Sequence, residues 1–149
     1  MKQKKLEPFK SRNIEIQLKC IELLSSNLQK HAFGAISHNS FNFNVNIETK
    51  VDDLNKLLFA IVYVEILTED QSQVLGGISV NCIFDLKNFD ELIKFESTGK
   101  HTLPQELVDI MNSISLSTTR GVMFATFKGT PLHNAFLPII DPKPFRPVK

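Results

Sequence analysis

The stretch from Phe41 to Ile47, FNFNVNI, decides the fold, because apolar and polar side chains alternate along it without a break. Successive side chains of a β-strand point to opposite faces, so this alternation predicts a strand with one buried and one solvated face. A turn is predicted over 51–55. The segment from Leu57 to Leu67 is then apolar on both faces. In an antiparallel sheet such a strand needs cover on both faces, or an interface.

The segments on either side of these two strands also have strand periodicity. Upstream, apolar and polar residues alternate from Ile14 to Cys20, and the phase slips at Cys20–Ile21, which predicts a β-bulge or strand end there. Downstream, residues 74–86 form a fourth strand whose apolar members share a face: Ile78, Val80, Cys82, Phe84 and Leu86. Gly76 and Gly77 inside it predict a bulge or a close backbone approach.

Helical signals follow the strands. Residues 85–95 are compatible with a short helix, and Thr102 with Gln105 forms a predicted capping box around Pro104. Apolar residues at helical spacing then predict a helix to about Arg120-Gly121: Leu103, Leu107, Ile110, Met111 and Ile114. We therefore expect an α+β fold, a four-stranded antiparallel sheet with one long C-terminal helix, and room for a short one, packed on one face. Residues 1–12 are expected to be flexible, and 13–149 to form a single domain whose Pro-rich end is extended from about 138.

Composition excludes several classes of protein. The 149 residues are 42% hydrophobic and 22% charged, with a formal net charge of +1. Arginine occurs only at Arg12, Arg120 and Arg146, which argues against a nucleic-acid footprint. The longest apolar run, Leu57 to Val64, is far too short to span a bilayer, and the basic N-terminus runs into no apolar stretch, so neither membrane insertion nor a signal peptide is expected. We expect a cytoplasmic protein.

No pattern of catalytic or metal-binding residues emerges. The four histidines lack the spacing of metal sites, so no metal and no cofactor is expected. Cys20 and Cys82 lie in predicted strand interiors, where two buried, reduced thiols are favoured over a disulfide or a nucleophile. An enzyme is therefore not expected. The unusual feature is twelve Phe with one Tyr and no Trp, apolar surface without a polar handle.

Three segments resemble the SecB-type preprotein chaperones. Ser115 to Phe124 (SLSTTRGVMF) resembles that family's helix end, where a Ser/Thr-Arg-Gly step precedes an apolar turn, here Thr119, Arg120 and Gly121. Asn81 to Phe84 (NCIF) looks like its Gly-Gly-Ile-Phe beside the fourth strand, and Leu132 to Pro142 (LHNAFLPIIDP) like its crossover after the helix. The resemblance covers roughly residues 14–145, and its weight lies in the collinear order of the strands.

The resemblance implies a chaperone that uses no ATP and associates into dimers or tetramers. Such chaperones hold unfolded secretory precursors in apolar grooves, which would give the excess Phe a role. Carried over, the client-binding positions are Phe33, Phe59, Tyr63, Ile78, Met123, Phe124 and Phe127.

The sequence also departs from that family. Our alignment places Cys20, Leu24 and Gly77 where the family has the residues, mostly acidic, that contact the SecA export motor, with Glu22 the nearest acid. The second long helix and the metal-binding tail find no counterpart, which argues against delivery to SecA.

Two functions from different classes remain open. One is ATP-independent binding of unfolded or extended polypeptides, either export precursors or a dedicated partner such as an antitoxin. The alternative is a non-enzymatic adaptor or structural subunit that uses the same apolar surface for oligomerisation or for binding one fixed partner.

Overall fold

The computed structural model describes residues 3–7, 9–11, 13–30 and 40–147. The elements in chain order are β1 (Lys10–Ser11), β2 (Ile14–Leu28), β3 (Phe41–Asp52), β4 (Leu57–Thr68), β5 (Val74–Leu86), α2 (Phe89–Leu92), β6 (Lys94–Phe95), β7 (His101–Thr102), α3 (Gln105–Thr126) and the 3₁₀ turn η1 (Lys143–Phe145).

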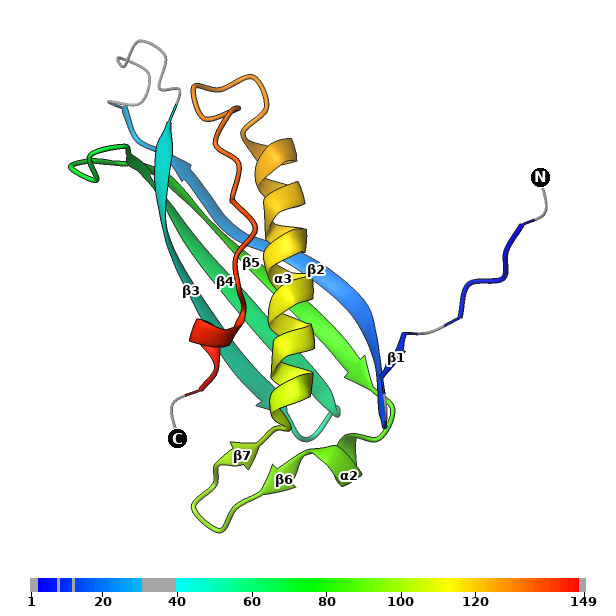
Figure 1. Cartoon of the computed structure of the whole chain (residues 1–149). Helices are drawn as coiled ribbons and strands as arrows, with labels where there is room; N and C mark the ends of the chain where they lie inside the picture. The colour runs from blue at the N-terminus through cyan, green and yellow to red at the C-terminus, as the bar shows by residue number, and fades with distance from the viewer. Residues whose placement is uncertain (1–2, 8, 12, 31–39, 148–149) are drawn as a thin grey trace.

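Within the described part of the chain, five antiparallel strands form a curled sheet in the order β1-β2-β5-β4-β3 (Figure 1). The expected number was four. The added strand, β1, pairs only with the first two residues of β2, and two residues are too few to carry a readable periodicity. β3 and β4 pair without interruption from Phe41 opposite Thr68 to Asp52 opposite Leu57, as the alternation predicted.

β2 carries two irregularities in its pairing with β5. The register shifts between Leu18 and Cys20, where the sequence phase slips, and again between Leu23 and Ser25. The predicted bulge is confirmed at the first position. The first shift keeps Leu18 on the same face of the sheet as Ile21 and Leu23, because all three lie opposite inward-facing residues of β5.

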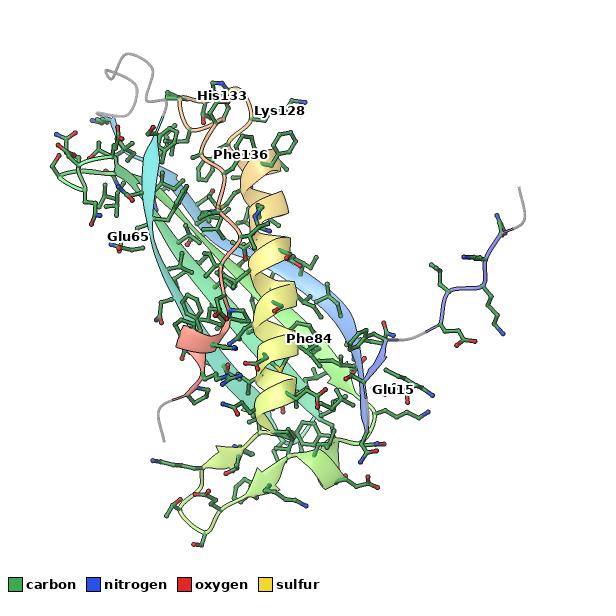
Figure 2. All side chains as sticks on the ribbon, viewed as in Figure 1. Glu15, Glu65, Phe84, Lys128, His133 and Phe136 are labelled. Carbon is green, nitrogen blue, oxygen red and sulfur yellow. The ribbon has the colours of Figure 1, made fainter. Side chains whose placement is uncertain are left out.

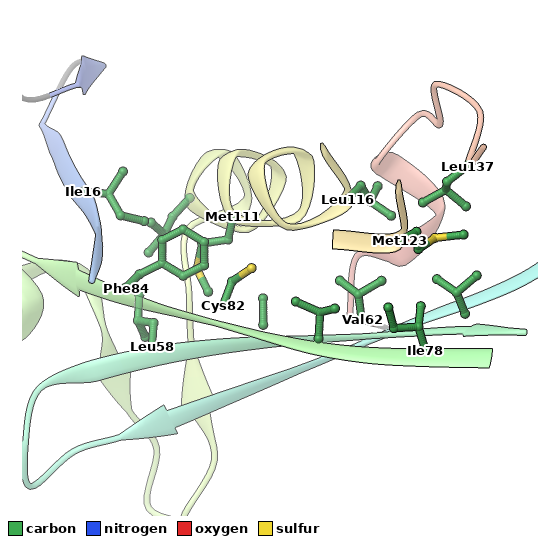
Figure 3. Close-up of a cluster of buried hydrophobic side chains, with 14 of the residues drawn as sticks. Ile16, Leu58, Val62, Ile78, Cys82, Phe84, Met111, Leu116, Met123 and Leu137 are labelled. Atoms are coloured by element: carbon green, nitrogen blue, oxygen red, sulfur yellow. The ribbon is translucent and has the colours of Figure 1, made fainter. Parts of the chain in front are cut away.

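One face of the sheet carries the hydrophobic core. Alternate residues of β4 and β5 are fully or almost fully buried under α3, and the largest is Phe84 (Figure 3). Met111, Leu116 and Met123 reach down from α3 to meet them. α3 lies mainly over β4 and β5 and touches β2 only slightly.

Gly76 is required by a close approach. A Cβ at this position would lie 2.6 Å from the Asn27 carbonyl oxygen and 2.7 Å from Leu132 Cδ1. The predicted close backbone approach is therefore confirmed. Because position 76 has no side chain, Leu132, which follows α3, can pack directly on the sheet.

The helix prediction was right about α3 but wrong about both of its ends. Thr102 does not cap the helix: it belongs to β7 and donates its hydroxyl to Glu96 at 2.8 Å, and the N-cap is Pro104 in extended conformation, with no side-chain cap hydrogen bond. At the other end, α3 continues through Gly121 to Thr126. Burial of Met123 and Phe127 against the core outweighs the weak helix preference of one glycine.

After α3 the chain turns and runs back along the helix. We call residues 132–147 the strap. Leu132, Ala135 and Leu137 are buried in the core; the strap begins in a turn, and its later part has no regular secondary structure apart from η1. Figure 1 shows the strap on the same side of the sheet as α3, next to the helix and toward β3.

Candidate functional site

Among the described residues, large apolar side chains reach the surface in three groups considered below, and also at Leu6, Phe9, Leu24, Leu54 and Phe95. The edge cluster comprises Leu18, Ile21 and Leu23 on β2, which are 38%, 45% and 49% exposed. The exit cluster comprises Phe124 on α3 with Phe136 and Ile139 on the strap, which are 57%, 52% and 96% exposed. The open-face patch comprises Phe59, Ile61 and Tyr63 on β4, on the sheet face that α3 does not cover; Tyr63 is 39% exposed, Phe59 is half-buried and Ile61 is buried.

The edge cluster exists because β2 lies outside the cover of α3. Its partners across the sheet, Phe84, Cys82 and Val80, are fully buried, whereas Leu18, Ile21 and Leu23 on the same face are not. On its outer side, within the described residues, β2 pairs only with β1, at Ile14 and Glu15. Most of this strand therefore offers unpaired backbone groups next to apolar side chains, the combination that favours addition of another strand.

The exit cluster lies where α3 ends and the strap begins. The rings of Phe124 and Phe136 stack with centroids 6.1 Å apart and an interplanar angle of 21°. Figure 2 shows Phe136 beside the C-terminal end of α3. Two stacked aromatic rings open to solvent form an apolar surface that a bound chain can cover.

The open-face patch has polar neighbours. Tyr63 donates its hydroxyl to Glu48 at 3.0 Å, and this hydrogen bond raises the pKa of Tyr63. A shallow hollow of about 300 Å³ lies beside Tyr63, floored by Gly77 and lined largely by Asn, Ser and Glu65. Val45, Val64 and Ile78 also line it, so it presents both polar and apolar surface.

Two arginines fasten the strap to α3. Arg120 donates to the carbonyl oxygens of Leu137 at 2.5 Å and Pro138 at 2.7 Å. Arg146 donates to both carboxylate oxygens of Asp109, at 2.8 and 2.6 Å. The hydrogen bonds from Arg146 lower the pKa of Asp109, so the pair is charged at neutral pH.

The α3 surface that faces the core holds polar groups without partners. Asn112 is fully buried, and neither polar atom of its amide makes a hydrogen bond to any described residue, whereas the buried hydroxyl of Ser115 interacts with the Cys82 thiol. Cys82 lies in the same core, and its burial raises the pKa of its thiol. Native proteins contain few such groups, so each needs an explanation.

The client-binding positions predicted from the resemblance do not form one groove. Ile78, Met123 and Phe127 are core residues, between 1% and 3% exposed, because helical and strand periodicity place them between α3 and the sheet. A client cannot reach them in this conformation. Phe59 and Tyr63 lie on the open face, whereas Phe124 lies on the helix side. Phe33 lies outside the described residues.

The Thr119-Arg120-Gly121 motif is structural. Thr119 is fully buried and donates its hydroxyl to the Ser115 carbonyl at 2.7 Å, while Arg120 holds the strap. Gly121 faces outward, and a Cβ there would meet nothing within 4 Å.

Sequence reasoning missed the edge cluster, the latch between Arg146 and Asp109, and the exposure of Cys20. Cys20 was expected to be buried, but it lies on the edge strand and on the face that α3 leaves open. The phase slip in β2 was a signal for an irregular strand, whereas the latch joins residues far apart in sequence and left no local signal.

The positions aligned with the family's motor contacts carry no charge: Cys20 and Leu24 are exposed, and Gly77 is buried between Val64 and Asn27. Among the described residues no group of three or more His, Cys, Asp or Glu side chains is placed to hold a metal ion. None of the helices that the structure describes has the length and apolar character that a membrane crossing requires.

Comparison by sequence matches no protein-family model and no curated protein. Comparison by structure matches the Mycobacterium tuberculosis Rv1957 SecB-like chaperone, solved in complex with a ChAD peptide from the Rv1956 HigA1 antitoxin. The match has a TM-score of 0.54 and 10% sequence identity, and it covers 84% of this chain and 87% of that one. The chain therefore has the fold of a SecB-like chaperone.

Proposed function

We propose that this protein, with its SecB-like fold, binds unfolded or extended polypeptides in the cytoplasm without ATP. The observation that carries the proposal is the exit cluster, in which two stacked Phe rings are more than half exposed at the surface of a folded chain. Contiguous exposed apolar surface of this kind marks a binding site more often than a solvated face. The peptide bound to the Rv1957 chaperone adds support from the fold, since that structure shows a polypeptide ligand on a related architecture.

The exit cluster fits an unfolded segment better than a folded surface. Phe124 lies on α3 and Phe136 on the strap beside it, so an extended client running along the strap would place apolar side chains on both rings. Burying one such phenylalanine contributes about 1.5–3 kcal/mol, which corresponds to roughly a tenfold change in affinity or more. Phe59 and Tyr63 would contact a client only where it passes around the sheet to the open face.

The test is suppression of the aggregation of a denatured model enzyme, measured by light scattering without nucleotide. We expect suppression at near-stoichiometric amounts, and we expect Phe124→Asp to weaken it about tenfold or more. Leu54→Asp is the matched control, because Leu54 is 89% exposed in the β3–β4 turn, away from the exit cluster. Absence of suppression by the unaltered protein, or equal loss in both variants, would refute the proposal.

The edge cluster favours self-association as a second candidate function. A second copy of β2 could pair with the first along its unpaired edge and cover Leu18, Ile21 and Leu23 at the same time. In the adaptor alternative, this contact and one fixed partner would use all the exposed apolar surface. Light-scattering mass with binding of an apolar dye separates the two: a chaperone keeps dye-accessible surface in its native oligomer, whereas an adaptor does not. Ile21→Lys should abolish the oligomer in either case.

A further inference from the structure

We propose that residues 138–147, the distal strap, occupy a groove beside α3 that client segments also bind. The segments it fits are extended, tolerate proline and carry an aromatic residue followed directly by arginine. This inference rests on the proposed function, and it adds a second site and the chemistry of its ligand.

The distal strap is seated as a bound peptide would be. It has no regular secondary structure before η1, and it pairs neither with the five-stranded sheet nor with the two-stranded sheet formed by β6 and β7. Ile140 and Phe145 pack against the core, while Ile139 and Lys143 between and beside them are exposed. Two apolar anchors separated by solvent-exposed residues are the usual arrangement of an extended segment in a groove.

Arg146, near the C-terminal end of the distal strap, makes the contacts that would select a ligand. Arg146 makes a two-pronged contact with Asp109, and the side-chain oxygen of Gln105, with the amide turned to face it, accepts from Arg146 Nη1 at 2.7 Å. A carboxylate held this way recognises the planar guanidinium fork better than an ammonium group. The Phe145-Arg146 pair therefore defines what the groove selects.

The groove also continues the exit cluster. Phe136 and Ile139 belong to the exit cluster, and Pro138, which begins the distal strap, lies between them. A client bound on Phe124 and Phe136 could continue into the groove once the distal strap has left the groove. One client segment could therefore contact both surfaces.

The experiment measures binding of a fluorescein-labelled peptide, FLPIIDPKPFRP, which copies residues 136–147, to the full-length chain by fluorescence anisotropy. Because the chain's own strap competes, binding to the unaltered protein should be weak. Arg146→Ala should bind the peptide about tenfold more tightly, since its groove is open for a larger fraction of the time. Lys100→Ala, which removes an exposed charge from the turn between β6 and β7, outside the strap, should behave as the unaltered protein.

Equal affinity of the unaltered protein and Arg146→Ala, or no binding by either, would overturn the inference. A scrambled peptide that bound as well would do the same. Should Arg146→Ala fail to fold, Arg146→Lys keeps the charge but not the two-pronged contact and should show a smaller gain in the same direction.

A second probe separates this inference from the proposed function. Reduced, carboxymethylated α-lactalbumin, which stays unfolded, should compete with the labelled peptide for Arg146→Ala. If the peptide binds and α-lactalbumin binds no variant, the groove stands and the proposed function fails. If α-lactalbumin binds the unaltered protein and Arg146→Ala equally and never displaces the peptide, the strap inference fails alone.

Discussion

Two glycine-to-alanine substitutions should change stability in opposite directions, and together they test how the strap and α3 are placed. Gly76→Ala introduces a methyl group 2.6 Å from the Asn27 carbonyl oxygen and 2.7 Å from Leu132 Cδ1. Gly121→Ala introduces the same group where nothing lies within 4 Å. The chemical change is identical, so the difference between the two reports only the surroundings.

The magnitudes follow from those surroundings. At Gly76 either the β2–β5 pair must separate or Leu132 must leave its place, and overpacking of this kind costs about 1–3 kcal/mol. At Gly121 the alanine gains about 1 kcal/mol of helix propensity without a steric cost. For a domain of this size 1 kcal/mol shifts the melting temperature by roughly 2–4 °C. We expect a fall of about 2–12 °C for Gly76→Ala and a rise of about 2–4 °C for Gly121→Ala.

The assay is thermal unfolding followed by circular dichroism, with the double variant included. The two sites are on different elements and share no contact, so the two effects should add in the double variant. A melting temperature unchanged or raised by Gly76→Ala would refute the packing of Leu132 on β5. A fall for Gly121→Ala would show that another surface covers that side of α3.

Three further predictions concern the strap and the thiols. Because Arg146 lowers the pKa of Asp109, the latch contributes stability above the ordinary carboxyl pKa of 3.8 and loses it as the pH falls through the lowered value; unfolding scans from pH 6 to 2.5 should show this loss, and Arg146→Ala should flatten it. Arg120→Ala should destabilise the chain by about 1.5–3 kcal/mol in urea unfolding, since it removes charged hydrogen bonds to two strap carbonyls, and no change would mean that the strap holds without it. Cys20 should react with a thiol reagent in the native protein while Cys82 reacts only after unfolding, as followed by mass spectrometry; rapid modification of Cys82 would contradict its burial.

Much of the fold was predictable because strand alternation is a local property. The strands β3, β4 and β5, the bulge in β2 and the close approach at Gly76 all follow from neighbouring residues. The resemblance to SecB-type chaperones, built on the order of these strands, agrees with the fold that structural comparison shows.

The remaining features could not be predicted from the sequence, because they depend on which elements pack against each other. The alternation of apolar and polar residues predicts that the two faces of β2 differ in polarity. It does not predict that α3 leaves Leu18, Ile21 and Leu23 uncovered. Similarly, Gly121 weakens a helix locally, and only burial of Met123 in the core explains why α3 continues past it. The client-binding positions were carried over as a set, and the structure divides them among the core, the open face and the exit cluster.

The most direct test of polypeptide binding at the exit cluster is photo-crosslinking. Benzoylphenylalanine would replace Phe124 in one variant and Leu54, in the β3–β4 turn, in another. With unfolded, carboxymethylated α-lactalbumin and no nucleotide, position 124 should crosslink and position 54 should not, and native α-lactalbumin should crosslink at neither. Equal crosslinking at both positions, or none at position 124, would contradict the proposal that this protein holds extended polypeptides on the Phe124–Phe136 surface.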